Sequence, residues 1–358
     1  MVGLTLLIAL IVLLILNVPV GIALGVASMF ALMVGDTLSL TSIPQALITS
    51  CDSFPILAIP LFILAGDLMG AGGVSRRILD VCNVFFGRIT GGLAIVTVLV
   101  CMFFAAVSGS GPATVAAVGT MVIPTMLKLG YDKSFVLALV ACAGSIGVII
   151  PPSIPMVIFG VSTGTSVTSL FMGGFLPGLL IGFSLIGYCY WFAKKHGYTG
   201  SKEPFDGKKA WAATWEAKWA LINPVIILGG IYAGLFTPTE AAAVAAIYAY
   251  VCGAFIYREL PPKKLIKAIG TSCSTTATTM VILGCATAFT KIITIEQIPT
   301  MVTQMMGNPD DDDCFRQPDR HSAPYQLDFA HRRLLHGYHS CHLGFGSDPL
   351  AGSNLYRS

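Results

Sequence analysis

Long apolar runs follow one another along most of this chain and limit its fold more than any other feature. Hydrophobic residues make up 55% of the 358 residues and charged residues only 11%, whereas soluble globular proteins carry about 25% charged residues. The sequence therefore predicts an all-α, polytopic membrane protein, and a net charge of +3 is too small to suggest a nucleic-acid partner. The apolar runs are 2–16, 18–34, 54–69, 91–107, 113–127, 135–150, 154–162, 168–193, 219–236, 238–256 and 271–290.

Several of these runs are shorter than the roughly 20 residues that a full crossing requires, and glycine or proline interrupts them. Interrupted segments must be buried in protein or line a cavity, because lipid offers the freed backbone groups no hydrogen-bonding partner. The pattern predicts broken helices and re-entrant hairpins, which secondary transporters use at their binding sites.

One interruption, Ser-Gly-Ser-Gly-Pro, lies in the middle of FFAAVSGSGPATVAAVGTMVIP, residues 103–124. We interpret it as an unwound crossover near the bilayer midplane, where bare carbonyls and hydroxyls replace the oxygen shell of Na+. Pro112 begins the second half-helix, whose positive end favours a carboxylate. Close helix packing through the glycines is the alternative. The candidate cation ligands are Ser108, Gly109, Ser110, Gly111 and Thr114.

A second interruption lies in AGSIGVIIPPSIPMVIFGVSTGTS, residues 143–166, where prolines stop a helix beside serines. This segment either lines the substrate cavity as a gate or is a rigid turn at the membrane surface, and both interpretations stay open. The candidate substrate or gate residues are Pro112, Ser145, Pro151, Pro152 and Ser153. The acidic residues closest to apolar segments, Asp52, Asp67 and Glu240, are further candidates, because carboxylates in membrane segments are commonly functional.

The lysine-rich connection 194–218 is predicted to be cytoplasmic by the positive-inside rule, as is the Arg/Lys cluster at 258–267 two crossings later. Trp211, Trp215 and Trp219 follow helical spacing, as expected for a helix at the membrane interface.

An internal repeat is suggested by similar segments on either side of this connection. One offset carries Pro19 onto Pro238 and Ser53 onto Ser272. Internal repeats with broken helices are typical of secondary transporters. We therefore expect a first membrane repeat over 1–193 with its broken helix at 108–114, an amphipathic linker over 194–218 and a second repeat beginning at 219–306.

Four motifs, SFPILAIPLFILAGDLM, SGSGPATVAAVGTMVIPTM, GSIGVIIPPSIPMVIFG and TPTEAAAVAA, resemble those of the large membrane subunit, DctM type, of tripartite ATP-independent periplasmic (TRAP) transporters. The resemblance runs from residue 1 to about residue 306. It implies a multi-pass protein of a bacterial or archaeal inner membrane, with an inverted-repeat, elevator-type architecture. It also implies a small membrane subunit (DctQ type) and a periplasmic substrate-binding protein (DctP type) as partners.

The resemblance further implies Na+-coupled uptake of organic acids such as C4-dicarboxylates or sialic acid, with no enzymatic activity and no cofactor besides the coupling ion. Sodium sites of that family use broken-helix and hairpin-tip backbone. In this chain those segments would be 108–114 and the region around Ser53 and Pro55.

The chain changes character after Met306, and five of its six histidines lie in this tail. HGYHSCH resembles a transition-metal site, but a better account exists. Permitted codons for 323–350, read one nucleotide later, encode an apolar segment interrupted by Asp-Thr-Thr-Pro-Ala, the expected second-repeat counterpart of Gly109–Ala113. We therefore expect a frameshift near 307–313, a non-native tail over 307–358, an incomplete second repeat and a truncated, inactive chain.

Two other functions stay open. One is an ion-coupled dicarboxylate or citrate carrier that works without a binding protein, which the absence of a neighbouring binding-protein gene would indicate. The other is a non-transporting membrane scaffold, which predicts no Na+-dependent ligand stabilisation. An enzyme is not expected, because the apolar core contains no nucleophile–base pair and no HExxH-type metal pair.

Overall fold

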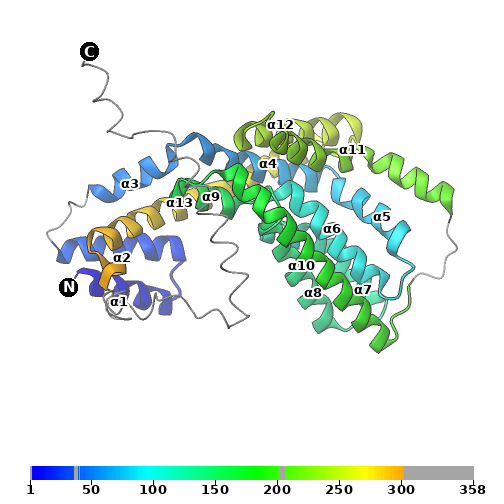
Figure 1. Ribbon diagram of the computed structural model, residues 1–358, viewed down its shortest axis with the longest axis horizontal. Coiled ribbons are helices and arrows are strands. Elements are labelled where there is room, and N and C mark those ends of the chain that lie inside the picture. The colour runs from blue at the N-terminus through cyan, green and yellow to red at the C-terminus, as the bar shows by residue number, and fades with distance from the viewer. Residues whose placement is uncertain (1, 36–38, 40, 201–205, 302–358) are drawn as a thin grey trace, which may run out of the picture. The chain divides into compact units, whose positions relative to one another are not determined.

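The structure is a computed structural model that describes residues 2–35, 39, 41–200 and 206–301. Within this described part every regular element is helical and no strand occurs, which confirms the predicted all-α fold (Figure 1). The elements are α1 (Val2–Ile15), α2 (Val20–Val34), α3 (Ser42–Cys51), η1 (Phe54–Leu57), α4 (Ala58–Ala71), α5 (Val74–Phe86), α6 (Gly92–Ser108), α7 (Gly111–Lys128), α8 (Lys133–Ser145), η2 (Ile146–Val148), α9 (Ile154–Thr163), α10 (Val167–His196), α11 (Gly207–Tyr232), α12 (Pro238–Val251), η3 (Cys252–Ile256) and α13 (Pro262–Ile295).

Four helical segments of the described chain are long and apolar enough to cross a membrane. The remaining apolar helices are shorter, as the interrupted runs predicted. The chain is therefore a multi-pass membrane protein that combines full spans with partial ones. The four long segments are Phe54–Ala71, Val167–His196, Pro238–Ile256 and Pro262–Ile295.

Three groups of buried apolar side chains hold the helices together. One joins α1, α2 and α3 to α13. A second joins α4 to α9 and α12, and the third lies among α5, α6, α7 and α8. Small residues dominate several contacts: Ala241, Ala242 and Ala245 of α12 are all buried, which allows close approach to α4.

Helices that correspond in the two similar segments make corresponding packing contacts, as expected for an internal repeat. The offset of the Pro19–Pro238 match superposes α2 on α12 and α3–α4 on α13. In the structure α2 packs on α13, α12 packs on α4, and α4 packs on α13. The match of Ser53 with Ser272 fails locally, because Ser53 precedes η1 whereas Ser272 lies within the continuous helix α13. Pro55 lacks a backbone N–H and favours the turn in the first segment only.

The predicted linker 194–218 contains the beginning of α11, which continues into the apolar run without a break. Asp206 caps this helix by accepting a hydrogen bond from the backbone N–H of Lys208. Trp211 and Trp215 stack on its exposed side, and the Lys218 ammonium lies 3.4 Å from the Trp215 ring centroid. Exposed tryptophans next to a lysine are typical of a helix segment at the membrane interface.

Candidate functional site

The stretch 103–124 forms a helical hairpin whose tip is Ser-Gly-Ser-Gly-Pro. Near the open end of the hairpin, the Thr97 hydroxyl of α6 lies 3.8 Å from the Met126 sulfur of α7. Since Thr97 lies near the start of α6 and Met126 near the end of α7, the two helices run antiparallel side by side. The predicted crossover within one spanning helix is therefore wrong in form. Gly109, with φ of 62°, allows the chain to reverse at this point.

Three oxygen atoms converge inside the hairpin tip. The Thr114 hydroxyl donates to the Ser110 carbonyl at 2.8 Å and lies 3.2 Å from the Ser108 hydroxyl. The Ser108 hydroxyl lies 3.5 Å from the same carbonyl. Ser108 is 1% exposed and Thr114 is fully buried, so protein rather than solvent surrounds this oxygen cluster. An oxygen-only donor set of this kind fits a hard cation such as Na+.

The second predicted interruption also forms a helix break. The chain leaves α8 through η2, passes a cis Pro151–Pro152 bond and begins α9 at Ile154. Ser153 caps α9, accepting from the Met156 N–H at 3.4 Å and donating to the Val148 carbonyl at 2.6 Å. A side-chain cap of this type contributes about 1 kcal/mol.

The two breaks have the same local construction. Ser110 caps α7 with φ −131° and ψ 120°, and Ser153 caps α9 with φ −132° and ψ 122°. Each serine is followed by one residue and then by proline, which suits the first turn of a helix. The sequence predicts that Pro112 begins the second half-helix. This half-helix is α7 in the structure, and Pro112 lies in its first turn as predicted.

The hairpin tip and the second break contact each other through backbone. The Ile154 N–H donates to the Gly109 carbonyl at 3.1 Å. A Cβ atom on Gly109 would lie 2.6 Å from the Pro152 carbonyl oxygen, and one on Gly147 would lie 2.7 Å from the Thr114 hydroxyl. Glycine at both positions is therefore required for this close approach.

Both amino and carboxyl ends of helices meet at this contact, and their dipole charges have opposite signs. The carboxyl ends of α6 and of α8–η2 present backbone carbonyl groups at this contact, and the amino ends of α7 and α9 present backbone N–H groups. The corresponding helix dipoles favour a cation at the first pair of ends and an anion at the second pair. The arrangement can thus hold a cation and a carboxylate as neighbours, although no described group of three or more His, Cys, Asp or Glu side chains could hold a metal ion.

The remaining candidate residues lie at different distances from this contact. Ser145 and Pro112 line a shallow cavity of about 490 Å³ between α7 and α8. The exposed Ser145 hydroxyl donates to the Cys142 carbonyl, so it faces this cavity rather than the buried oxygen cluster. The structure brings together these predicted residues: Ser108, Gly109, Ser110, Gly111, Thr114, Pro152 and Ser153, with Pro151 adjoining them.

Ser53 and Pro55 do not join the hairpin tip. They lie at the start of η1, where the Thr239 hydroxyl of α12 donates to the Phe54 carbonyl at 3.2 Å. The α4 residue that meets the tip is Gly66, where a Cβ atom would lie 2.9 Å from that of Ser108. Eleven or more residues of helix separate the two places, about 15–20 Å along the axis.

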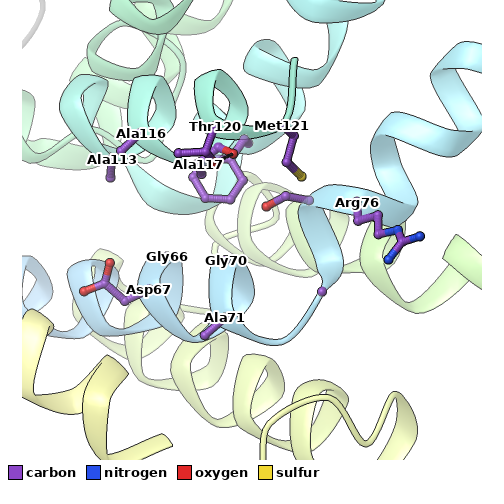
Figure 2. A pocket seen from close by; sticks show the side chains of 13 residues that line it. Gly66, Asp67, Gly70, Ala71, Arg76, Ala113, Ala116, Ala117, Thr120 and Met121 are labelled. Atoms are coloured by element: carbon purple, nitrogen blue, oxygen red, sulfur yellow. Dashed lines mark hydrogen bonds between the residues drawn. The ribbon is translucent and has the colours of Figure 1, made fainter. Parts of the chain in front are cut away.

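Sequence reasoning missed Gly66 as the contact to the tip, and the only signal was its place in a small-residue segment of the apolar run. Beside this contact lies a cavity of about 450 Å³, with α4 residues along one wall and α7 residues along the other (Figure 2). Small residues, including Gly70, Ala113 and Ala117, leave this space open. The adjacent Asp67 turns toward α13, where the Ser272 hydroxyl donates to its carboxylate at 2.6 Å.

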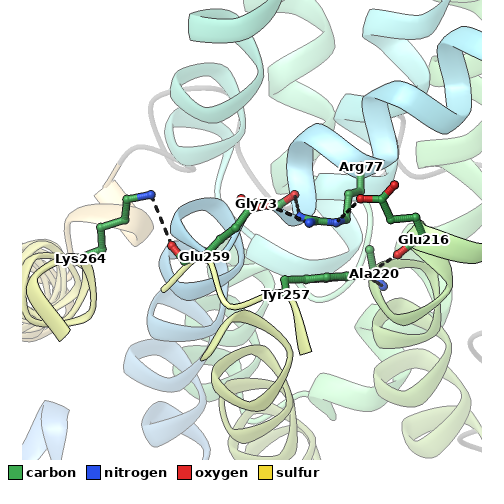
Figure 3. Close-up of polar contacts among 7 residues, drawn as sticks. All are labelled: Gly73, Arg77, Glu216, Ala220, Tyr257, Glu259 and Lys264. Atoms are coloured by element: carbon green, nitrogen blue, oxygen red, sulfur yellow. Dashed lines mark hydrogen bonds and ion pairs between the residues drawn. The ribbon is translucent and has the colours of Figure 1, made fainter. Parts of the chain in front are cut away.

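A group of polar contacts centred on Arg77 ties α5 to two other segments (Figure 3). The guanidinium lies 2.7 Å from the Glu259 carboxylate, 3.4 Å from that of Glu216 and 3.9 Å from the Tyr257 ring centroid. Burial raises the pKa of Tyr257 to about 12, so its hydroxyl stays protonated at neutral pH. This hydroxyl donates to the Glu216 carbonyl and accepts from the Ala220 N–H.

The family model described as "Tripartite ATP-independent periplasmic transporter, DctM component" matches residues 7–315. The chain belongs to this family. Its members are transport permeases, so the family confirms the expectation that the chain is not an enzyme.

Relatives of known name agree with this assignment. The isethionate TRAP transporter permease protein DctMQ of Oleidesulfovibrio alaskensis is 49% identical over 293 residues, which cover 82% of this chain and 46% of that protein. The C4-dicarboxylate TRAP transporter large permease protein DctM of Vibrio cholerae is 42% identical over 314 residues, covering 82% and 69%. The 2,3-diketo-L-gulonate TRAP transporter large permease protein YiaN of Escherichia coli is 40% identical over 282 residues, covering 79% and 65%. The chain thus spans from about half to two thirds of the length of these relatives.

The TRAP permease motifs lie at the contacts described above. Those in α6–α7 and α8–α9 form the two halves of the contact between the helix breaks. The motif in α4 supplies Gly66, and the motif at the start of α12 supplies the Thr239 bond to Phe54. The predicted frameshifted tail, 307–358, and the histidine cluster within it lie outside the described residues.

Proposed function

We propose that this chain is part of a Na+-coupled secondary transporter that imports a small organic acid. The observation that carries this proposal is the meeting of the hairpin tip with the second helix break, where buried oxygens and two helix amino ends adjoin. Coupled transport of an anion requires a cation site and an anion site close enough for each to stabilise the other. The oxygen cluster of Ser108, Ser110 and Thr114 supplies the first, and the amino ends of α7 and α9 supply the second.

The names of the relatives and this electrostatic arrangement support a proposal for the substrate class. The names of similar permeases specify isethionate, C4-dicarboxylates, 2,3-diketo-L-gulonate and ectoine, all of which carry a carboxylate or sulfonate. A carboxylate or sulfonate is also the group that paired helix amino ends favour. We therefore propose a small carboxylate or sulfonate as the substrate, C4-dicarboxylates and sialic acid included.

The proposed setting is the inner membrane of a bacterial or archaeal cell. The partners are a small membrane subunit of DctQ type and a periplasmic binding protein of DctP type. The fused DctMQ name of one relative supports the first partner, and the tripartite family description supports both. The contacts around Arg77 support the orientation, because they hold together the segments at 207–218 and 258–267 that the positive-inside rule assigns to the cytoplasm.

We also propose that residues 307–358 are out of frame and that the printed chain is inactive as a transporter. The family match ends at residue 315, close to the predicted shift at 307–313. The activity of the whole protein would then depend on a second hairpin that this tail does not encode.

The cation site is tested by the thermal stability of the full chain in detergent, with Na+ exchanged against K+. We expect Na+ to raise the unfolding midpoint, because a ligand that binds only the folded state stabilises it. Thr114→Val keeps the side-chain shape but removes the hydroxyl of the oxygen cluster, so the Na+ effect should disappear.

Thr120→Val is the matched control, because Thr120 lies on the same helix and, among the described residues, its exposed hydroxyl bonds to the Ala117 carbonyl rather than to the oxygen cluster. This variant should respond to Na+ as the native chain does. An undiminished Na+ effect in Thr114→Val would contradict the proposed site, and so would the absence of any Na+ effect in the native chain.

A further inference from the structure

One face of α13 carries lysines and hydroxyls although the helix is long and apolar enough to span a membrane. Lys264, Lys267, Thr271, Thr275 and Thr278 follow a three- and four-residue spacing, which places them along one side of the helix. All five are exposed. We name this side the polar face of α13. Polar residues of membrane helices usually face the protein interior or a water-filled cavity rather than lipid.

A cavity of about 400 Å³ opens at the lysine end of the polar face. Asp67 and Ala71 of α4 form one wall, and Lys264, Lys267 and Thr271 contribute to the other. Two lysines opposite one carboxylate leave the cavity with a net positive charge, which attracts anions. The volume falls within the range of about 300–1,000 Å³ that is usual for small-molecule sites.

The contacts of these side chains suit a hydrated passage. The Lys264 ammonium donates to the Glu259 carbonyl at 3.3 Å, which fixes its position at the cytoplasmic end (Figure 3). The hydroxyls of Thr271 and Thr278 donate to backbone carbonyls one turn earlier, so their lone pairs remain available to water. Further along the same side, Ile282 packs against Gly21 of α2, where a Cβ atom would lie 2.8 Å away. The polar face therefore ends where protein begins to cover it.

The passage also adjoins the candidate cation site. Asp67, which lines this cavity, directly follows Gly66, the residue that meets Ser108 at the hairpin tip. Asp67 additionally lines the cavity between α4 and α7, so the same carboxylate borders both spaces. Lys264 and Lys267 line the cavity on the α13 side of this carboxylate.

We propose that the polar face of α13 lines a water-filled passage for a small organic anion, a carboxylate or sulfonate, between the hairpin-tip site and the cytoplasm. The inference rests on the proposed transport function, and it assigns Lys264 and Lys267 the role of selecting for negative charge. The threonine hydroxyls keep the passage hydrated.

The chain offers a matched pair of positions for a test by thiol labelling. Cys273 is exposed and lies on α13 about 200° around the helix and about 3 Å along its axis from Thr275. The native Cys273 thus reports the opposite side of α13 at the same depth. The probe is the sulfonatoethyl methanethiosulfonate anion, and the trimethylammonioethyl reagent of opposite charge serves as its counterpart.

Both measurements use the full chain in lipid nanodiscs with the exposed Cys142 replaced by serine, and peptide mass spectrometry locates the label. In C273S/T275C the new thiol should react at least about tenfold faster than Cys273 does, because only a hydrated thiol forms the reactive thiolate. The anionic reagent should react faster than the cationic one at position 275. K267Q should lower this ratio severalfold, with K264Q acting in the same direction.

Equal labelling of positions 273 and 275 would overturn the passage, since both sides of α13 would then have the same environment. Fast labelling without a preference for the anionic reagent, or a preference that K267Q leaves unchanged, would overturn the anion selectivity. The labelling measurements require neither Na+ nor transport. A failure of the passage is therefore distinguishable from a failure of the cation site, which the Thr114→Val measurement reports.

Discussion

Individual glycines determine whether the two helix breaks can meet. Gly109 reverses the chain at the hairpin tip and passes close to the Pro152 carbonyl, while Gly66 and Gly147 approach the tip from two other elements. Each contact joins backbone to backbone, or backbone to a hydroxyl. No side chain could fill the same space without moving a neighbouring helix.

Gly109→Ala should therefore destabilise the protein more than another glycine of the same backbone conformation. Gly164 has φ of 70° but no atom within 4 Å of a Cβ position, so Gly164→Ala adds only backbone strain, about 1–2 kcal/mol. Gly109→Ala adds the same strain and a contact with the Pro152 oxygen, and its unfolding midpoint in detergent should fall further. Equal midpoints for the two variants would show that the helix breaks separate without cost.

Sequence reasoning identified the residues of the site better than their arrangement. Ser108, Ser110 and Thr114 were predicted from a run of helix-disfavouring residues with hydroxyls in an apolar segment, and the structure brings them together. The partner at Gly66 was not predicted, because a glycine among small apolar residues gives no sign of what packs on it. Ser53 was assigned to the cation site by resemblance alone, and it lies before η1, away from the α4 residue Gly66 that meets the tip.

At the level of elements, the sequence predicts where helices break but not how the pieces are arranged. A crossover and a hairpin both need glycine and a capping serine, and Ser-x-Pro begins a new helix in either case. The difference depends on tertiary packing of α6 against α7 along their whole lengths, for example at Thr97 and Met126. That packing involves apolar surfaces whose partners the local sequence does not specify.

The position of α5, the helix that leads from α4 to the hairpin, depends on Arg77. Its side chain is only 13% exposed and contacts α11 and the segment before α13. Arg77→Met should lower the free energy of unfolding by about 2–3 kcal/mol, through the lost charge-assisted bonds and the lost contact with Tyr257. The carboxylates of Glu216 and Glu259 remain in contact with water in this variant, which limits the loss of stability.

The neighbouring Arg76→Met is the control for the Arg77 measurement. Arg76 is exposed, so its substitution should change stability by less than about 0.5 kcal/mol. Thermal unfolding of both variants under the same detergent and salt conditions checks the difference. Similar losses at the two positions would contradict the role of Arg77 as the anchor of α5.

On the scale of the whole molecule, the packing of α2 on α13 and of α12 on α4 indicates where the second hairpin of the proposed restored chain would lie. The hairpin α6–α7 packs on α4. Since α13 corresponds to α4 in the offset that superposes α2 on α12, a second hairpin would be expected on α13. The Asp-Thr-Thr-Pro-Ala segment that permitted codons would encode in the proposed shifted frame is the sequence expected at the tip of that hairpin.

Transport measurements on two genes test this account of the tail. One gene encodes the printed chain, and in the other the reading frame is restored between codons 307 and 313. Each is produced with a small membrane subunit and a periplasmic binding protein of DctQ and DctP type, and uptake of a labelled carboxylate or sulfonate is measured in the presence of Na+. Only the restored chain should transport, because only it supplies both hairpins to the site. Uptake by the printed chain at a comparable rate would contradict both the frameshift and the need for a second hairpin.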